Sequence, residues 1–197
     1  GIVVIGAALL VSGALWQSRV EAPVIQSPIP ASPTSAVVTT SVSEKPTSAA
    51  PTSSVAKFPI NPADTIALWS FKGAYTGNDT LVAKADADVA HLKSILGKGQ
   101  YDDYDLYLGI GNDADLVGDG ALAYQNYNRS ISIHPNKGLA YDNLGHLMDE
   151  LGAYHTAADA YAKAVAVEPL VEQYRVSQLD FLTERFPEEA ARLKANQ

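Results

Sequence analysis

The strongest constraint on the fold of this 197-residue chain is an internal repeat, whose period of 34 residues is the separation of Pro135 and Pro169. Between Tyr104 and Pro169 the sequence presents the same pattern twice. The matched positions are Tyr107 with Tyr141, Ile110-Gly111 with Leu144-Gly145, Ala114 with Met148, Gly118 with Gly152, Ala123 with Ala157, and Tyr127 with Tyr161. Repetition at such a spacing predicts a stack of similar units, in which each unit buries its apolar face against its neighbours.

Each unit is expected to be a pair of antiparallel helices. Gly111 and Gly145 fall in the middle of predicted helices, where glycine costs about 1 kcal/mol relative to alanine. A glycine at the same place in both units indicates that two backbones approach closely there. The small Ala123 and Ala157 are expected to admit a large aromatic side chain of a neighbouring helix, and the prolines to end the second helix of each unit.

At these positions the chain resembles the tetratricopeptide repeat (TPR) family, whose pattern is an aromatic residue, Leu-Gly, a second aromatic residue, Ala-x3-aromatic and a closing Pro. The resemblance covers residues 101–169 and implies an all-α, right-handed superhelix of antiparallel helix pairs that binds other proteins. Ala114 and Met148 replace the second aromatic residue, and Gly120 stands where the next unit has Tyr154. The first unit is therefore expected to pack more loosely.

The segment before the two units, residues 58–100, is interpreted as a helical hairpin that forms a degenerate repeat or a cap. Its first helix is expected to start with Asn61 as N-cap and to end before Gly77. Its second helix is expected to have Asp79 as N-cap and to end at Gly97.

The segment after the two units, residues 170–197, is interpreted as helices that cap the C-terminal end of the stack. We expect an amphipathic helix over residues 170–185 and a short polar helix over residues 188–194.

Residues 1–18 are uncharged and mostly apolar. Sixteen helical residues span about 24 Å, less than the roughly 30 Å of a bilayer's hydrocarbon, and because the chain starts at glycine we expect residues to have preceded it. Three interpretations stay open: an uncleaved membrane anchor, the remainder of a secretory signal, and a helix that packs with copies of itself in a surface filament, as in pilins. The third is favoured by small residues that let helices approach closely, Gly6, Ala7, Ala8, Ser12 and Gly13. Gly1 and Ile5 depart from the type IV pilin pattern.

Residues 19–57 are dominated by Pro, Ser and Thr and have few large apolar side chains. Such a composition predicts an extended, partly polyproline-II linker between the N-terminal helix and the repeats. The β-prone residues 37–42 leave a second interpretation open, in which the segment orders as a strand against a neighbouring copy.

Charge is unevenly distributed between the linker and the repeats. Residues 1–57 carry two acidic and three basic residues, so the remaining 20 acidic and 11 basic residues give residues 58–197 a net charge of −9. This argues against a nucleic-acid partner and leaves residues 1–18 as the membrane contact if there is one. The chain has no cysteine, which excludes disulfides and thiolate sites.

The TPR resemblance also implies a binding groove lined by the first helix of each pair. The groove positions on this chain are Asp105, Leu108, Asn112, Asp115, Asp142, Asn143, His146, Asp149 and Glu150. Because they are mainly acidic, we expect them to bind a basic or polar protein segment, for example a segment of another copy of the chain, or else to form a solvated surface without a partner. The lysines with which some TPR domains grip a carboxylate are missing.

We expect no metal, no cofactor and no catalysis. Asp142, His146 and Glu150 recur at a spacing of four residues on one helix face, but ion-pair and solvation roles are commoner for such a stripe. Residues 112–118 have only a superficial similarity to a calcium loop, since Val117 falls where an oxygen ligand is required. Phosphate-binding and hydrolase motifs are missing.

The sequence thus predicts an extracytoplasmic, non-enzymatic interaction module at the cell surface. The leading hypothesis is self-association into a filament or other homopolymer, through the N-terminal helix, the linker and the repeat surfaces. The alternative is a membrane-anchored adaptor that recruits a different protein in its acidic groove.

Overall fold

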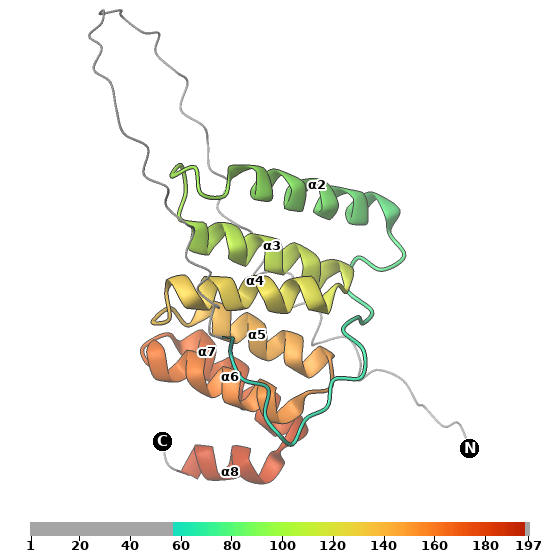
Figure 1. Cartoon of the computed structure of the whole chain (residues 1–197). Coiled ribbons are helices and arrows are strands. Elements are labelled where there is room, and N and C mark those ends of the chain that lie inside the picture. Colours follow the sequence, from blue (N-terminus) through green and yellow to red (C-terminus); the bar gives the residue numbers. More distant parts are fainter. Residues whose placement is uncertain (1–56, 196–197) are drawn as a thin grey trace, which may run out of the picture. The chain divides into compact units, whose positions relative to one another are not determined.

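The computed structural model describes residues 57–195, all within one compact unit of the chain, residues 51–197. In the described range it contains seven helices and no named strand (Figure 1). They are α2 Asp79–Ile95, α3 Asp103–Val117, α4 Gly120–Ile133, α5 Leu139–Glu150, α6 Tyr154–Val167, α7 Glu172–Arg185 and α8 Pro187–Ala195. The all-α prediction is confirmed for this range, in which no helix is long and apolar enough to cross a membrane. The predictions for residues 1–18 and for the linker up to residue 56 lie outside it.

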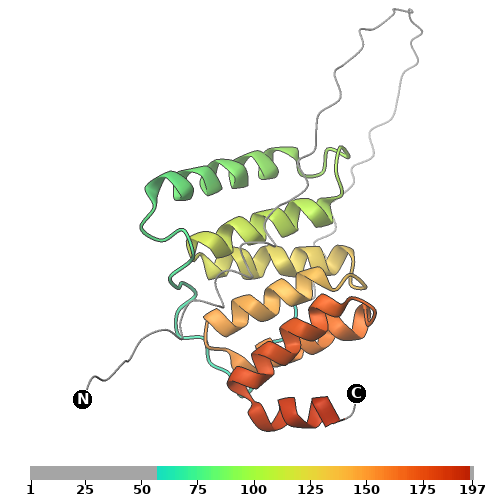
Figure 2. The ribbon, with the colours of Figure 1, turned by 180° about the vertical axis from the view of Figure 1, so that it is seen from behind.

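The helices pack mainly against their neighbours in the chain. Helices α3 with α4, α5 with α6, and α7 with α8 form successive pairs, and α2 packs on α3. Figures 1 and 2 show α2 at one end of the stack and α8 at the other. Because α5 also contacts α3 and α7, the first helices of the three pairs lie next to one another.

The 34-residue period is visible in the helix boundaries. Both ends of α6 lie 34 residues after the corresponding ends of α4. Helix α3 is capped by Asp102, whose carboxylate accepts a hydrogen bond from the Tyr104 backbone N–H at 2.9 Å, and α4 is capped by Asp119, which accepts from the Leu122 N–H at 3.0 Å. Gly118 separates these helices with φ 84°, a conformation that favours glycine.

The mid-helix glycines are explained by tyrosine rings. A Cβ at Gly111 would lie 2.5 Å from the Tyr127 ring, and a Cβ at Gly145 would lie 2.9 Å from the Tyr161 ring. The expected backbone-to-backbone approach is therefore wrong, because in each unit a side chain of the second helix covers the glycine of the first. Tyr127 is 1 % exposed and Tyr161 7 %, so each ring fills the interior of its own pair.

Residues 57–78, here called the extended segment, contain turns but no helix, so the predicted first helix over residues 61–77 is wrong. Residues 58–100 therefore contain a single helix, α2, which follows the extended segment, and do not form a helical hairpin. Its N-cap is Asn78, not Asp79, with the Asn78 carboxamide oxygen accepting from the Leu81 N–H at 3.2 Å.

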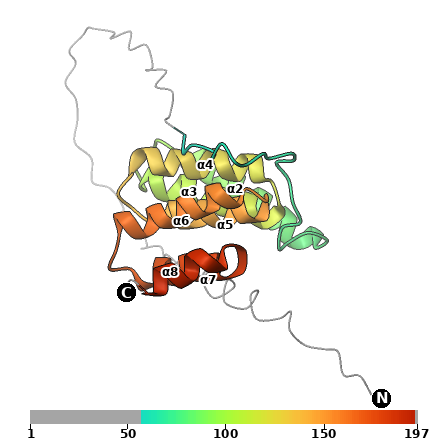
Figure 3. The same cartoon turned by 90° about the horizontal axis from the view of Figure 1, so that it is seen from below.

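The extended segment is not helical because its backbone groups bond to other parts of the fold. The Phe71 N–H donates to the Gly118 carbonyl at 3.2 Å, and the Tyr75 N–H donates to the Leu116 carbonyl at 2.8 Å. Its apolar side chains are partly buried against the core. These are Phe58, Ile60, Ile66, Trp69 and Phe71. The apolar residues whose spacing favours a helix thus belong to a non-helical segment that lies beside α4 (Figure 3).

Candidate functional site

The nine predicted groove residues come from α3 and α5. Helix α3 carries Asp105, Leu108, Asn112 and Asp115, and α5 carries Asp142, Asn143, His146, Asp149 and Glu150. Three of them are buried: Leu108 is 7 % exposed, Asp115 4 % and Asp142 3 %. Because α5 packs against α3, these three side chains lie inside the helix stack. The surface that a partner can reach is reduced to the other six positions.

Polar groups in the centre of the groove bond to one another. The Asn143 Nδ2 donates to Asn112 Oδ1 at 2.8 Å, and the Tyr127 hydroxyl donates to the same oxygen at 3.1 Å. The hydroxyl also lies 3.5 Å from Asp115 Oδ2. Burial, with the charge of Asp115 added, raises the pKa of Tyr127 well above its ordinary value. One asparagine thus links the two helix pairs, which is a structural role for a residue predicted to bind a partner.

His146 bridges the buried and exposed carboxylates of the groove. Its Nδ1 lies 3.5 Å from Asp115 Oδ2, and its Nε2 lies 3.9 Å from Glu150 Oε1. Burial lowers the pKa of His146, but the hydrogen bond and charge of Asp115, with the charges of Glu150 and Asp149, raise it overall. The imidazole is therefore held as a cation to higher pH than a free histidine and offsets part of the acidic charge.

A second cation at the groove comes from α7. The Arg185 Nε lies 2.8 Å from Asp149 Oδ1, and its guanidinium lies 4.7 Å from the centre of the Tyr154 ring. The sequence argument missed this pair because Arg185 lies outside the two matched units. The groove is therefore less acidic than its own residues indicate, and Asp105 and Glu150 remain its exposed carboxylates.

The stripe Asp142, His146 and Glu150 does not form a metal site in the described part of the chain. Asp142 is buried, whereas Glu150 is exposed. No cluster of three or more His, Asp or Glu side chains among residues 57–195 is arranged to hold a metal ion.

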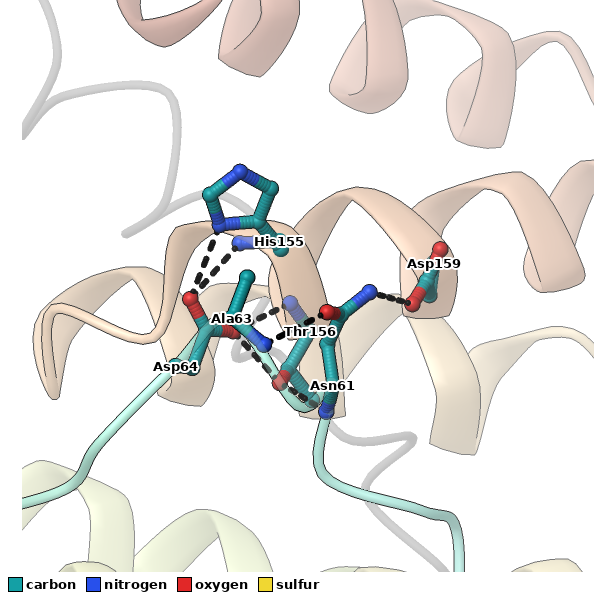
Figure 4. Close-up of polar contacts among 6 residues, drawn as sticks. All are labelled: Asn61, Ala63, Asp64, His155, Thr156 and Asp159. Atoms are coloured by element: carbon teal, nitrogen blue, oxygen red, sulfur yellow. Dashed lines mark hydrogen bonds and ion pairs between the residues drawn. The ribbon is translucent and has the colours of Figure 1, made fainter.

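A polar site that the sequence argument did not predict joins the extended segment to α6 (Figure 4). Asp64 Oδ2 accepts hydrogen bonds from the Thr156 N–H at 2.6 Å and the Thr156 hydroxyl at 2.7 Å. Asp64 Oδ1 accepts from the His155 N–H at 3.3 Å and lies 3.0 Å from His155 Nδ1. The Asn61 backbone N–H donates to Thr156 Oγ1 at 2.9 Å, and the Asn61 side-chain Nδ2 donates to Asp159 Oδ2 at 2.8 Å.

These contacts supply the N-terminal cap that α6 lacks. The N-cap of α6 is Ala153, which has no capping side chain, whereas the matching position before α4 is Asp119. Asp64 bonds the free N–H groups of α6 from about 90 residues earlier in the chain, and its negative charge lies at the positive end of the helix. A missing cap in the second unit was the one sequence signal for this site.

The surroundings of Asp64 favour its charged form. Its side chain is 5 % exposed. Burial alone raises the pKa of Asp64, but the hydrogen bonds from Thr156 and His155 lower it overall. The site holds the extended segment against the helix pairs.

Comparisons of the chain with protein-family models, with curated proteins and with solved structures found no match.

Proposed function

We propose that the protein is a non-enzymatic, TPR-type interaction module displayed outside the cytoplasm, and that it assembles with copies of itself into a surface filament or other homopolymer. The proposal is carried by the repeated packing of the two helix pairs. In each pair a tyrosine of the second helix covers a glycine of the first, Tyr127 on Gly111 and Tyr161 on Gly145. This equivalence supports a TPR-type superhelix, an architecture that presents binding surfaces along and at the ends of its stack.

A second repeated contact supports the same architecture. The Arg129 guanidinium lies 5.2 Å from the centre of the Tyr107 ring, and the Lys163 ammonium lies 6.0 Å from the centre of the Tyr141 ring. The tyrosines are equivalent positions of the two units, and so are the cations, since each is 34 residues from its counterpart. Each unit therefore keeps the same cation–π pair between its first and second helix.

Self-association is assigned to residues 1–18, the linker and the helix-pair surfaces. Small residues in an apolar helix allow close helix packing, and many tethered copies raise the effective concentration of every weaker surface. The proposed localisation outside the cytoplasm is supported by the sequence alone, in which an apolar N-terminal segment is joined to a Pro/Ser/Thr-rich linker.

The experiment compares the full chain with a chain lacking residues 1–18 by sedimentation and negative-stain microscopy. Polymers are expected from the full chain alone. The double variant Gly6→Ile/Gly13→Ile is expected to lose them because the helices no longer approach closely, whereas Leu9→Ile is the control that retains them. Discrete small particles from the unaltered chain in detergent would overturn self-association.

A membrane-anchored adaptor is the second candidate, and the charge around Glu150 favours it. Burial raises the pKa of Glu150, and the carboxylates of Asp115 and Asp149 raise it further although His146 and Arg185 oppose them. A cationic partner segment would relieve this excess of negative charge. A labelled lysine-rich peptide should then bind more weakly to Glu150→Lys than to the control Asp86→Lys, an exposed position on α2. Equal binding to both would remove the groove as its site.

A further inference from the structure

Helix α2 is attached to the rest of the helix stack through α3 alone. It lies at one end of the stack, and among the described helices only α3 packs against it (Figure 1). Ala85 is its one buried residue, and Val89 and Leu92 are only partly buried. No side chain of α2 belongs to the main hydrophobic core of the described residues. Separation of α2 from α3 would therefore leave that core intact.

The contact between α2 and α3 brings two carboxylates face to face. The two helices run antiparallel (Figure 1), and a Cβ at Gly109 of α3 would lie 3.0 Å from Leu92 Cδ1 of α2. Asp113 lies one turn after Gly109, and Asp88 lies one turn before Leu92. In an antiparallel pair these positions are opposite each other. The contact therefore places like charges on its two sides.

The surroundings of Asp113 oppose its ionisation. Its side chain is partly buried. Burial and the negative charge of Asp88 raise the pKa of Asp113 to about 6, although the ammonium group of Lys84 opposes this rise. On α4, the charge of Asp113 also helps to raise the pKa of the buried Tyr127 hydroxyl, which stays neutral. Without α2, Asp113 would lose both Asp88 and Lys84 as neighbours and become more exposed, so its pKa would return towards 3.8.

Glycines flank α2 on both sides. Gly77 precedes the helix with φ 85° and Gly97 follows it with φ 69°. A Cβ at either position would have no atom within 4 Å, so packing does not fix these two backbones. The Gly97 N–H donates to Asp103 Oδ1 at 2.9 Å, but this hydrogen bond is exposed and competes with water. Both connections of α2 can thus act as hinges.

We propose that α2 is a hinged lid on α3, and that proton uptake by Asp113 closes it more firmly. Because the closed form binds the proton more tightly than the open form, closure strengthens as pH falls through about 6. At neutral pH the ionised Asp113 repels Asp88, and the lid opens more often.

Opening of the lid changes the surface at this end of the stack. Leu106 and Ile110 are 5 % and 0 % exposed, and helical spacing puts them on the same side of α3 as Gly109 and Asp113. An open α2 uncovers this apolar side, so pH sets how often it meets solvent. The inference does not depend on the proposed function.

Hydrogen exchange of the full chain in mild detergent, at about pH 7.5 and about pH 5, tests the lid. Exchange rates are corrected for their intrinsic dependence on pH, and the amides of α6 in the same chain are the reference. We expect α2 to be less protected than α6 at both pH values. Relative to α6, protection of α2 should rise roughly three- to tenfold at the lower pH, the upper limit being set by a pH about one unit below the pKa of Asp113, and solvent screening reducing it.

Three variants assign the effect to the facing carboxylates. Asp113→Asn should raise the protection of α2 at neutral pH and remove its dependence on pH. Asp88→Asn should reduce this dependence, because the repulsion across the contact is lost. Asp86→Asn is the matched control, since Asp86 is an exposed carboxylate of the same helix, and it should keep the full dependence. Unchanged protection of α6 shows that each variant is folded.

Two results would overturn the proposal. Equal protection of α2 and α6 at both pH values would mean that α2 opens only when the whole unit unfolds. A pH dependence of α2 protection that is missing from the unaltered chain, or that persists in Asp113→Asn, would exclude Asp113 as the group that closes the lid.

Discussion

In each helix pair, one tyrosine of the second helix packs so closely on the first helix that the residue beneath its ring must be glycine. Helix α3 provides a matched pair, since Gly109 and Gly111 both lie inside it. A Cβ at Gly109 would meet only the end of the flexible Leu92 side chain at 3.0 Å, whereas at Gly111 it would meet the fully buried Tyr127 ring. Replacing either glycine by alanine therefore changes helix propensity in the same way, and the two substitutions differ only in what the added Cβ would contact.

We predict that Gly111→Ala destabilises the protein and that Gly109→Ala does not. Alanine gains about 1 kcal/mol of helix propensity at either position, but overpacking against the Tyr127 ring costs about 1–3 kcal/mol. Urea unfolding of the full-length variants measures the difference. Equal stability of both variants would show that the tyrosine ring moves aside without cost.

Asp64 gives a prediction about pH. Its pKa is lowered from 3.8 in the folded protein, so its stabilising contribution is complete above the unfolded-state value and is lost as pH falls through the folded-state value. Asp64→Ala should cost about 0.5–2 kcal/mol at pH 7, as expected for the loss of a helix cap.

The cost of Asp64→Ala should shrink when urea unfolding is repeated near pH 3. Asp86→Ala is the control, because Asp86 is an exposed carboxylate on α2. A cost that does not change with pH would assign the effect of Asp64→Ala to lost packing and neutral hydrogen bonds.

On the scale of secondary-structure elements, the extended segment and the α3–α4 turn require each other. Gly118 and Gly152 are equivalent residues with φ 84° and 72°. A Cβ at Gly118 would lie 2.1 Å from the Phe71 carbonyl oxygen, whereas a Cβ at Gly152 has no atom within 4 Å. The extended segment approaches the first turn this closely and leaves the second turn open.

We therefore predict that Gly118→Ala is more disruptive than Gly152→Ala. Both variants pay about 1 kcal/mol for placing alanine in the left-handed region, and only Gly118→Ala must also displace Phe71. Trypsin should cleave after the exposed Lys72 faster in Gly118→Ala than in Gly152→Ala. Equal cleavage rates would mean that the segment is held mainly by its other contacts.

For the complete chain, the net charge of −9 over residues 58–197 bears on assembly. Folded units of like charge repel one another, and salt screens this repulsion, with a Debye length of about 30 Å at 0.01 M and about 8 Å at 0.15 M. We predict that the sedimenting fraction of the full chain rises between these two salt concentrations. A fall would indicate that ion pairs between copies hold the polymer together.

Local sequence patterns were sufficient for the paired helices. The 34-residue period predicted that α4 and α6 occupy equivalent positions, and the two glycines that it matches, Gly118 and Gly152, both adopt positive φ just before those helices. Helix periodicity and turn preference depend on residues close in the chain. The same patterns gave the helices at α2, α7 and α8 to within a few residues.

Contacts between distant residues decided the rest. Residues 61–77 have apolar spacing suited to a helix, yet they are extended because Leu116 and Gly118 take their backbone hydrogen bonds. Asp64 caps a helix that starts 90 residues later, and Arg185 neutralises a groove carboxylate from a third pair. These partners are set by packing in three dimensions, which local propensity and spacing along the chain do not encode.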